Sequence, residues 1–285
     1  ILNCKKTFKF DKKDKFILLP YLSFDLSVFP LWNSLFSGST LFYTTGSDII
    51  YPMNYIKKNK ITVYCSVPSQ VDVIKNSLQD NNFKTKSVRL SVFCGEPLKY
   101  SHVNIWKRYC SNSKIFNTYG PSETTCFNTY FRVQKINKKK LSEVVSLGKP
   151  MQNNKIFIKN REIIISGPQV SKGYLENRLN KNKFIINKDN VYYKTGDLAK
   201  KIGKDFYFIG RKDQQIKISG YRVELGDIEK NISKSINNKK VQAFSKKNKI
   251  YAVIESRDML QKSQHELIKK NLPNHMIPKK IFYLS

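Results

Sequence analysis

Residues 114–125 read KIFNTYGPSETT, in which a short apolar run leads into a Gly-Pro turn and then into hydroxyl and carboxylate side chains. The turn would set the ring of Tyr119 beside the carboxylate of Glu123 and the hydroxyl of Thr124. These groups suit a nucleotide, because a ring stacks on a base, hydroxyls bind phosphate oxygens and a carboxylate binds Mg²⁺. Taken alone, the stretch fits an ordinary β-turn with a helix cap equally well.

Strand-like and helix-like segments alternate along the first half of the chain. Strands are expected at residues 16–20, 40–44, 61–66, 90–94 and 114–117, with helices at 26–36, 53–60, 70–79 and 101–109. Strands separated by helices are typical of βαβ units and a largely parallel sheet. We therefore predict an α/β fold, with residues 1–140 as the α/β part of a large N-terminal domain.

Beyond residue 140 the pattern changes twice. Short β runs at 156–158, 162–166, 191–194 and 206–209 lie between Gly, Asn and Lys turns. They predict a β-rich subdomain, a small barrel or sheet, over residues 141–212. Residues 213–285 contain a hairpin, a helix at 224–236, strands at 241–244 and 250–255, and a helix at 264–272. This last pattern predicts a small α+β C-terminal domain.

The chain is strongly basic, with 52 Lys and Arg residues against 21 Asp and Glu and a formal net charge of +31. Eight of the basic residues are arginine, and the lysines are spread along the whole chain. Side chains that read base edges or bind phosphates bidentately are more often arginine. We therefore predict no nucleic-acid partner and assign the lysine run at 138–140 to a solvated loop.

The cysteine and histidine content excludes several kinds of site. The five cysteines form no C-x-x-C pair, and the three histidines lie far apart in the sequence. This argues against a disulfide scaffold, a zinc ribbon and a Ser-His-Asp triad, and it favours a reducing, cytoplasmic compartment. No apolar run approaches the roughly 18–20 residues of a membrane helix, so we predict no membrane span.

Four more segments follow the first in order. They read EIIISGPQVSKGYL (162–175), YKTGDL (193–198), GRKDQQIKISGYRVE (210–224) and LPNHMIP (272–278). Together the five segments resemble the AMP-forming adenylate ligases, a superfamily that includes nonribosomal peptide adenylation domains, acyl-CoA synthetases and luciferases. Two shorter segments, FDLS (24–27) and FCGE (93–96), are most similar to amino-acid activators, and the closest likeness is to the D-alanine–carrier protein ligases.

The resemblance implies a reaction in two steps. A carboxylate attacks the α-phosphate of ATP·Mg²⁺ to give an acyl-adenylate, and the phosphopantetheine thiol of a carrier protein then takes the acyl group. The implied cofactors are ATP and Mg²⁺, and the implied partners are a carrier protein and a small, D-alanine-like amino acid. Two alternatives stay open: an acyl- or aryl-CoA synthetase of the same superfamily, and a catalytically dead basic binding module.

The resemblance also assigns the nucleotide contacts of the first segment. Tyr119 would stack on adenine and Asn117 would lie near its amino edge, with Thr118 and Gly120 in the same binding stretch. The catalytic pair in that segment is Glu123, which would bind Mg²⁺, and Thr124, which would hydrogen-bond the α-phosphate.

Two later residues are implied to bind the ribose. Asp197 would accept hydrogen bonds from the ribose hydroxyls, and Arg211 would add donors and positive charge. Asp197 could instead be a turn residue, Arg211 a surface cation, and Glu123 an exposed acid in a first helical turn.

The acyl side of the site is implied by the amino-acid activators. Asp25 would pair with the substrate's ammonium group, although it could instead cap the helix that follows. The pocket would be lined by Leu26, Phe29, Cys65, Val92, Cys94, Thr118, Cys126 and Phe127. We assign Cys94 a steric role, since a free cysteine is usually a buried, inert thiol.

The resemblance also implies that the small C-terminal domain is mobile. Asp213 would be the hinge of this domain, and Gly220 would lie in the thiolation loop, where the lack of a Cβ permits close passage of the phosphopantetheine arm. The segment 37–40 imitates a phosphate loop but lacks the following Gly-Lys, so we predict a structural turn there.

Both ends of the chain are expected to be truncated. The chain opens on Ile1 rather than Met, and it closes on the apolar run 281–285. The superfamily's phosphate loop would precede Ile1, and its catalytic lysine would follow Ser285, because Lys279 and Lys280 stand too early. A protein limited to these residues is expected to be inactive in adenylation.

Overall fold

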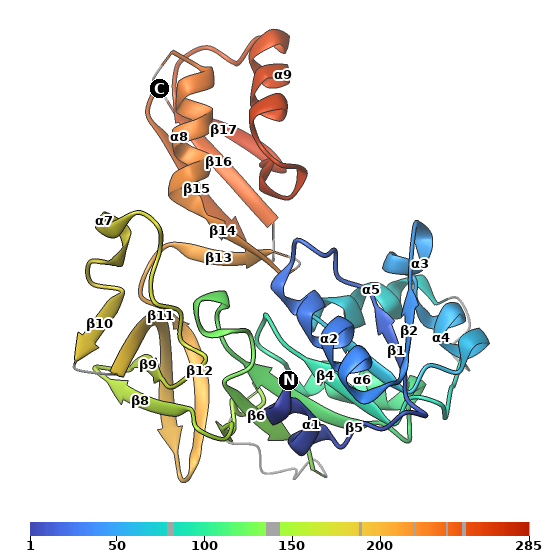
Figure 1. Cartoon of the computed structure of the whole chain (residues 1–285). Coiled ribbons are helices and arrows are strands. Elements are labelled where there is room, and N and C mark those ends of the chain that lie inside the picture. The colour runs from blue at the N-terminus through green and yellow to red at the C-terminus, as the bar shows by residue number, and fades with distance from the viewer. Residues whose placement is uncertain are drawn as a thin grey trace. The chain divides into compact units, whose positions relative to one another are not determined.

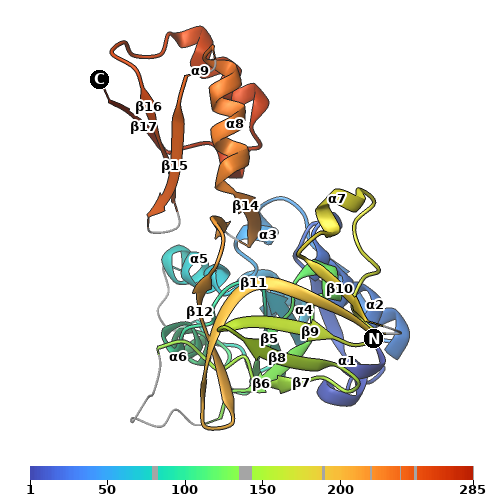
Figure 2. The same cartoon turned by 90° about the vertical axis from the view of Figure 1, so that its left-hand side faces the viewer.

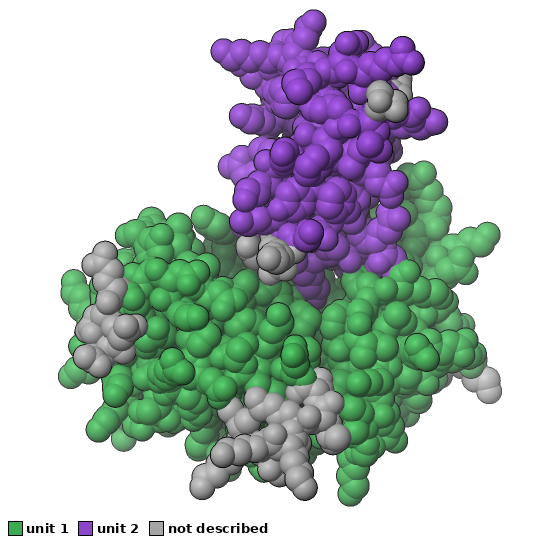
Figure 3. All heavy atoms as spheres, turned by 180° about the vertical axis from the view of Figure 1, so that it is seen from behind, with its two compact units in different colours: residues 1–212 green, residues 213–285 purple. Residues whose placement is uncertain are grey.

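The computed structural model describes residues 1–78, 83–134, 143–187, 190–218, 220–237, 239–246 and 249–284. The chain divides into two units, residues 1–212 and residues 213–285, which are green and purple in Figure 3. The lysine run at 138–140 and the expected boundary after residue 140 lie outside the described residues.

Within the described part of the first unit, seven strands form one sheet in the order β2-β1-β3-β4-β5-β6-β7 (Figure 1). The strands are β1 (Lys15–Leu18), β2 (Thr40–Tyr43), β3 (Val63–Ser66), β4 (Leu90–Phe93), β5 (Lys114–Tyr119), β6 (Thr129–Arg132) and β7 (Lys149–Pro150). The pairs from β2 to β5 are parallel, whereas β6 and β7 add antiparallel pairs at one edge. The predicted α/β fold with a largely parallel sheet is confirmed.

Helices cover both faces of this sheet. The helical segments are α1 (Leu2–Phe8), η1 (Asp25–Ser27), α2 (Val28–Ser37), α3 (Ser47–Ile50), α4 (Met53–Asn59), α5 (Ser69–Ser77), α6 (Tyr100–Tyr109) and η2 (Ser122–Thr124). Successive side chains of a strand point to opposite faces of the sheet. Because β3 and β4 are buried along their whole length, the side chains on both faces enter apolar clusters. Tyr64 and Phe93 enter one cluster, and Cys65 and Val92 enter the other.

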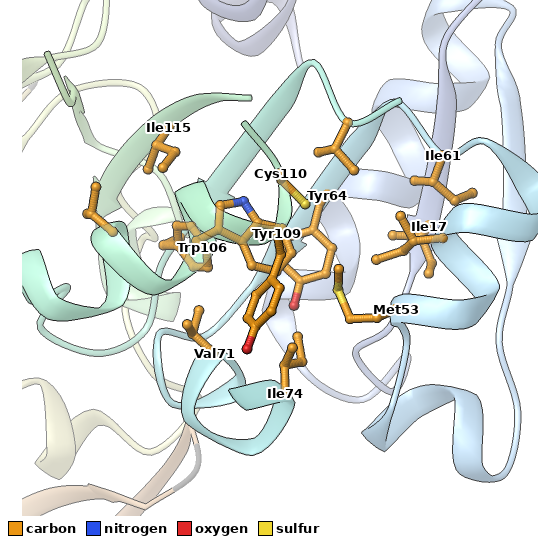
Figure 4. Packing of buried hydrophobic residues seen from close by; sticks show 14 of the residues in the cluster. Ile17, Met53, Ile61, Tyr64, Val71, Ile74, Trp106, Tyr109, Cys110 and Ile115 are labelled. Carbon is orange, nitrogen blue, oxygen red and sulfur yellow. The ribbon is translucent and has the colours of Figure 1, made fainter. Parts of the chain in front are cut away.

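The cluster around Tyr64 packs α4, α5 and α6 against one face of the sheet (Figure 4). Trp106 of α6 stacks on Tyr64 with the ring centroids 4.4 Å apart. Its indole Nε1 donates to Ser91 Oγ at 2.7 Å, so the one polar group of this fully buried side chain has a partner. This packing leaves the opposite face of β3, β4 and β5 to the cluster that contains the predicted acyl pocket.

The β-rich part of the first unit is a second, antiparallel sheet. It contains β8 (Lys155–Lys159), β9 (Glu162–Ser166), β10 (Phe184–Asn187), β11 (Asn190–Ile202) and β12 (Asp205–Arg211), with the short helix α7 (Asn177–Asn180) before β10. The long strand β11 pairs with β10 near its start, with β12 near its end, and with β9 on its other side (Figure 2).

This second sheet is open over the residues that the structure describes. Strand β8 pairs with β9, and no pairing joins β8 to β10 or β12. The small barrel expected from the sequence is therefore corrected to an open sheet. The reason is that β10 and β12 share one side of β11, and so they do not extend the sheet round toward β8.

The second unit combines a hairpin with a small α+β sandwich. Its described elements are β13 (Gln215–Ile218), β14 (Tyr221–Glu224), α8 (Leu225–Ser235), β15 (Val241–Lys246), β16 (Lys249–Glu255), α9 (Lys262–Asn271), η3 (Asn274–Met276) and β17 (Lys280–Leu284). Ile228 and Ile232, one helical turn apart on α8, pack with Ile254 of β16 in its core. Among the described helices of either unit, none is both long and apolar enough to cross a bilayer.

Candidate active site

A buried group of three side chains joins the two sheets of the first unit. Tyr119 is the last residue of β5, and its hydroxyl donates to Asp197 Oδ2 at 2.8 Å. Asp197 lies in β11 directly opposite Arg211 of β12, whose Nη1 donates to Asp197 Oδ1. Arg211 Nη2 also donates to the carbonyl oxygen of Thr195 at 3.3 Å. The two charged side chains are only 5% and 10% exposed, so their charges balance inside the protein.

The protonation state of Tyr119 follows from this burial. Burial, and then the negative charge of Asp197, raise the pKa of the Tyr119 hydroxyl well above its usual value. Tyr119 is therefore a neutral donor across the physiological pH range. Asp197 lies within a strand and the Arg211 side chain is only 10% exposed, which disfavours the alternatives of a turn aspartate and a surface cation.

Glu123 lies in η2 and is also buried rather than exposed on a helix. Its Oε1 accepts a hydrogen bond from the hydroxyl of Tyr174, and its carbonyl oxygen accepts one from the N–H of Ser171 at 2.8 Å. The hydroxyl of Tyr193 lies 3.5 Å from that of Tyr174. Burial, followed by the charge of Glu123, raises the pKa of Tyr193, so the Tyr193 hydroxyl is neutral beside this pair.

The donor set around Glu123 fits a hard cation. Carboxylate and hydroxyl oxygens are the ligands that Mg²⁺ prefers, and Mg²⁺ often uses one or two carboxylates together with substrate phosphates and waters. Over the described ranges, no group of three His, Cys, Asp or Glu side chains could hold a metal by itself. Glu123 therefore fits as one protein ligand to a Mg²⁺ ion that arrives with a nucleotide.

Three further predicted residues of the first segment bond mainly to neighbouring backbone. Asn117 Nδ2 donates to the carbonyl oxygen of Ser146 at 2.8 Å, and Thr118 Oγ1 donates to that of Phe93 at 3.1 Å. Thr124 Oγ1 lies within hydrogen-bond distance of the carbonyl oxygen of Pro121, at 3.1 Å, and of Asn128 Oδ1, and its single hydrogen can be donated to either oxygen. These bonds place the three side chains at the site while using them to hold its backbone.

Gly120 is required by this close packing. A Cβ at position 120 would clash with the carbonyl oxygen of Cys126 and with Asn128 Oδ1. The turn after β5 therefore folds back on itself only because residue 120 has no side chain.

The predicted acyl-pocket residues meet on the other side of the same segment. Leu26, Phe29, Cys65, Val92, Cys94 and Phe127 are buried in one apolar cluster, with Cys126 packed against it. Thr118 lies beside them but bonds to β4, as described above. The rings of Phe29 and Phe127 have centroids 5.1 Å apart, so large side chains already occupy much of the space.

Asp25 lies at the border between this cluster and the first segment. It begins η1 without capping it, and its carboxylate accepts a hydrogen bond from the hydroxyl of Ser122. Burial, and then the charge of Asp25, raise the pKa of the Cys126 thiol. Burial likewise raises the pKa of Cys65 well above its usual value, so these two thiols are protonated and are poor nucleophiles.

The predicted hinge residue and the predicted thiolation-loop residue lie in the second unit. Asp213 is its first residue, and Asp213 Oδ1 accepts a hydrogen bond from the N–H of Gln215 at 3.4 Å. Gly220 lies between β13 and β14 with a φ of +84°, a conformation that favours glycine.

The segment 37–40 is a structural turn, as the sequence predicts. Gly38 ends α2 in the left-handed conformation with a φ of +63°. The hydroxyls of Ser37 and Ser39 donate to carbonyl oxygens of the same helix, those of Asn33 and Ser34.

Several residues of the site were not predicted from the sequence. Tyr174 and Tyr193 lie in segments quoted above, yet they were not assigned to Glu123, which is 51 positions before Tyr174. Helix α1 was also missed, and its Phe8 packs edge-on against Phe29 with centroids 5.7 Å apart. The signal was present in the apolar residues Cys4 and Phe8, four positions apart among lysines.

The sequence and the fold are similar to those of known proteins. Residues 1–175 match the family model described as AMP-binding enzyme. The chain is 33% identical over 297 residues to the D-alanine–D-alanyl carrier protein ligase of Bacillus licheniformis, covering 92% of the chain and 57% of that protein. It is 29% identical to bacitracin synthase 1 of the same species, covering 100% of the chain and 6% of the synthase.

A solved structure matches the whole chain. The Vibrio cholerae adenylation domain AlmE, in complex with glycyl-adenosine-5'-phosphate, superposes with a TM-score of 0.88 and 25% sequence identity. The match covers 100% of this chain and 58% of that one. The chain thus spans little more than half the length of the Bacillus licheniformis ligase and of AlmE.

Proposed function

Because this chain belongs to the AMP-binding enzyme family, we propose that it activates a small amino acid with ATP and transfers it to the phosphopantetheine thiol of a carrier protein. The first step would give an aminoacyl-adenylate and pyrophosphate. The second would form a thioester on the carrier. The carrier ligase among the relatives and the glycyl-adenylate in the AlmE structure support this choice of substrate and partner.

The observation that carries the proposal is the bond between Asp25 and Ser122. Ser122 directly precedes Glu123, so this bond joins the carboxylate proposed for the substrate's ammonium to the segment proposed for Mg²⁺ and phosphate. An amino acid has its ammonium one carbon from its carboxylate. A site that activates it therefore needs an anion close to the phosphate-binding groups, and a fatty acid would leave that anion unpaired.

The nucleotide would bind along Tyr119, Asp197 and Arg211. We propose that the ring of Tyr119 stacks on adenine, near Asn117, while its hydroxyl remains bonded to Asp197. A carboxylate has about four lone-pair sites. Asp197 can therefore accept hydrogen bonds from ribose hydroxyls in addition to those from Tyr119 and Arg211.

The phosphate groups would face Glu123 and Thr124. Bound Mg²⁺ supplies positive charge that neutralises phosphate oxygens during displacement. Glu123 would hold this ion, and the Tyr174 hydroxyl would keep its carboxylate in one orientation. Thr124 would donate its single hydroxyl hydrogen to the α-phosphate in place of the protein oxygens that it now faces.

The second half-reaction would involve the second unit. We propose that Asp213 is the hinge at which this unit changes orientation, and that Gly220 lies in the loop that faces the carrier's phosphopantetheine arm. In the first unit, we keep the division into an α/β part and a β-rich part that ends at residue 212, but place the boundary after β7 (Lys149–Pro150) rather than at residue 140, because β7 belongs to the first sheet. The free cysteines support a cytoplasmic location, where thiols remain reduced.

The test is ATP–pyrophosphate exchange by the protein that contains residues 1–285 with its natural flanking sequence. Glycine and both enantiomers of alanine should support exchange, and propionate, which lacks the ammonium group, should not. Asp25→Asn should lower kcat/KM for the amino acids by about 30- to 1,000-fold, which corresponds to about 2–4 kcal/mol for an unpaired charge. Asp227→Asn makes the same change of charge on the exposed face of α8 and should leave exchange unchanged.

Two other outcomes would reject the proposal. Equal exchange with propionate and alanine would favour an acyl- or aryl-CoA synthetase. Absence of nucleotide binding together with salt-sensitive DNA binding would favour a basic binding module.

A further inference from the structure

The backbone after Thr124 takes an unusual path. Thr125 and Cys126 have φ values of +61° and +63°, and the N–H of Phe127 donates to the carbonyl oxygen of Thr125 at 2.7 Å. This bond closes a three-residue turn around Cys126. Positive φ is unfavourable for a β-branched residue such as threonine, and a three-residue turn with positive φ at its centre is rare and strained. Such a turn persists only where its surroundings hold it.

One side chain holds both ends of this turn. Gln169 Nε2 donates to the carbonyl oxygens of Phe127, at 3.1 Å, and Thr125, at 3.4 Å. The hydroxyl of Thr125 in turn donates to the carbonyl oxygen of Gln169 at 2.9 Å. The carbonyl groups on either side of Cys126 are therefore held by a single amide.

The amide of Gln169 is itself fixed by two asparagines. Its Oε1 accepts hydrogen bonds from Asn154 Nδ2 at 2.7 Å and from Asn3 Nδ2 at 3.3 Å. A glutamine side chain has two donor hydrogens and two acceptor lone pairs, and here all four are used. Gly167 permits this packing, because a Cβ there would lie 2.8 Å from Asn154 Oδ1.

The turn lies between the proposed phosphate-binding residues and the proposed acyl pocket. On one side it follows Glu123 and Thr124 directly. On the other side, Phe127 packs against Phe29, and the carbonyl oxygen of Cys126 accepts a weak hydrogen bond from Cys94 Sγ at 3.9 Å. A change in the turn would therefore move pocket-lining atoms of Cys126 and Phe127 without removing either side chain.

We propose that Gln169 is a positioning residue that sets the size of the acyl pocket by holding the turn of residues 125–127. The pocket role rests on the proposed function, whereas the hold on the turn does not. A rigid turn keeps Cys126 and Phe127 against Phe29 and limits the pocket to small side chains. A loosened turn lets these residues retreat and admits larger ones.

The hold on the turn is tested by the reactivity of Cys126. Gln169→Met keeps the length of the side chain but removes both donors and the acceptor. Cys126 is partly exposed while the other four cysteines are buried, so alkylation by iodoacetamide, mapped by mass spectrometry, reports on it selectively. We expect alkylation of Cys126 to become about tenfold faster, because local opening of the turn hydrates the thiol and favours its thiolate.

The matched control is Gln70→Met. Gln70 Nε2 also donates to a backbone carbonyl oxygen, that of Ile50, at 2.7 Å, and it lies on α5 of the same unit. This variant should leave the alkylation rate of Cys126 unchanged. If Gln169→Met does not yield folded protein, Asn154→Ala removes one of the two donors that fix the glutamine oxygen and should give a smaller increase in the same direction.

The pocket role is tested by substrate selection in pyrophosphate exchange. In Gln169→Met, the ratio of kcat/KM for leucine to kcat/KM for alanine should rise about tenfold. The ratio is informative because a general loss of structure would lower kcat/KM for both amino acids alike. KM for ATP should stay within about twofold of its wild-type value. Unchanged alkylation of Cys126 would overturn the proposal. Faster alkylation with an unchanged substrate ratio would overturn the pocket role. If no amino acid supports pyrophosphate exchange by the wild-type protein, the proposed function is rejected. The alkylation rate would still decide whether Gln169 holds the turn.

Discussion

Asp197 and Arg211 form an ion pair between neighbouring strands with very little exposure to water. Replacing Asp197 with Asn removes the charge that balances the guanidinium, and breaking a buried pair in this way typically costs about 3–5 kcal/mol. We expect Asp197→Asn to lower the free energy of unfolding by about 3 kcal/mol in urea titrations. Glu176→Gln is the matched control, because it breaks a pair with Arg178 whose side chains are 58% and 82% exposed, and its cost should stay below about 1 kcal/mol. Similar losses in the two variants would contradict a buried, charged role for Asp197.

Helix α1, which was not predicted from the sequence, contributes Cys4 and Phe8 to the apolar cluster that contains the predicted acyl-pocket residues. Phe8 is 4% exposed and packs edge-on against Phe29 and Phe116, with ring centroids 5.7 and 5.1 Å away. Truncating a buried phenylalanine leaves a cavity, so Phe8→Ala should lower the free energy of unfolding by about 3–5 kcal/mol. Leu2→Ala on the same helix removes a side chain that is 65% exposed and should cost less than about 0.5 kcal/mol. Thermal and urea unfolding of both variants check this, and a small cost for Phe8→Ala would show that α1 is not part of the core.

The sequence predicts elements best where the pattern is local. The buried strands β3 and β4 are recognisable because both faces are apolar, and α8 because its apolar residues recur at helical spacing. Closure of the second sheet could not be predicted, since it depends on which strands pair with β11 rather than on any strand's own residues. The contacts of Tyr174 and Gln169 were hidden for the same reason. Each joins the second sheet's loops to a segment more than 40 positions away, so only the packed fold brings them to Glu123 and Thr125.

Thiols that are buried in neutral form make the stability of the protein depend on pH above about 9. Burial raises the pKa of Cys4 from 9.0 to about 11 and that of Cys110 from 9.0 to about 12. Their stabilising effect is complete below pH 9, where the unfolded thiols are still protonated, and it is lost as pH rises toward 11 or 12. Over this range each thiol lowers the free energy of unfolding by about 1.4 kcal/mol per pH unit, because the thiol ionises in the unfolded chain and not in the folded chain.

Deprotonation of lysines acts in the opposite direction by reducing the self-repulsion of a chain with a net charge of +31. Comparison with Cys110→Ala cancels that shared effect, since both proteins carry the same lysines. Between pH 9 and 11, urea titrations under reducing conditions should show the stability advantage of the wild type over this variant shrinking by about 1.4 kcal/mol per pH unit. An advantage that stays constant over this range would mean that Cys110 ionises as readily in the folded protein as in the unfolded chain.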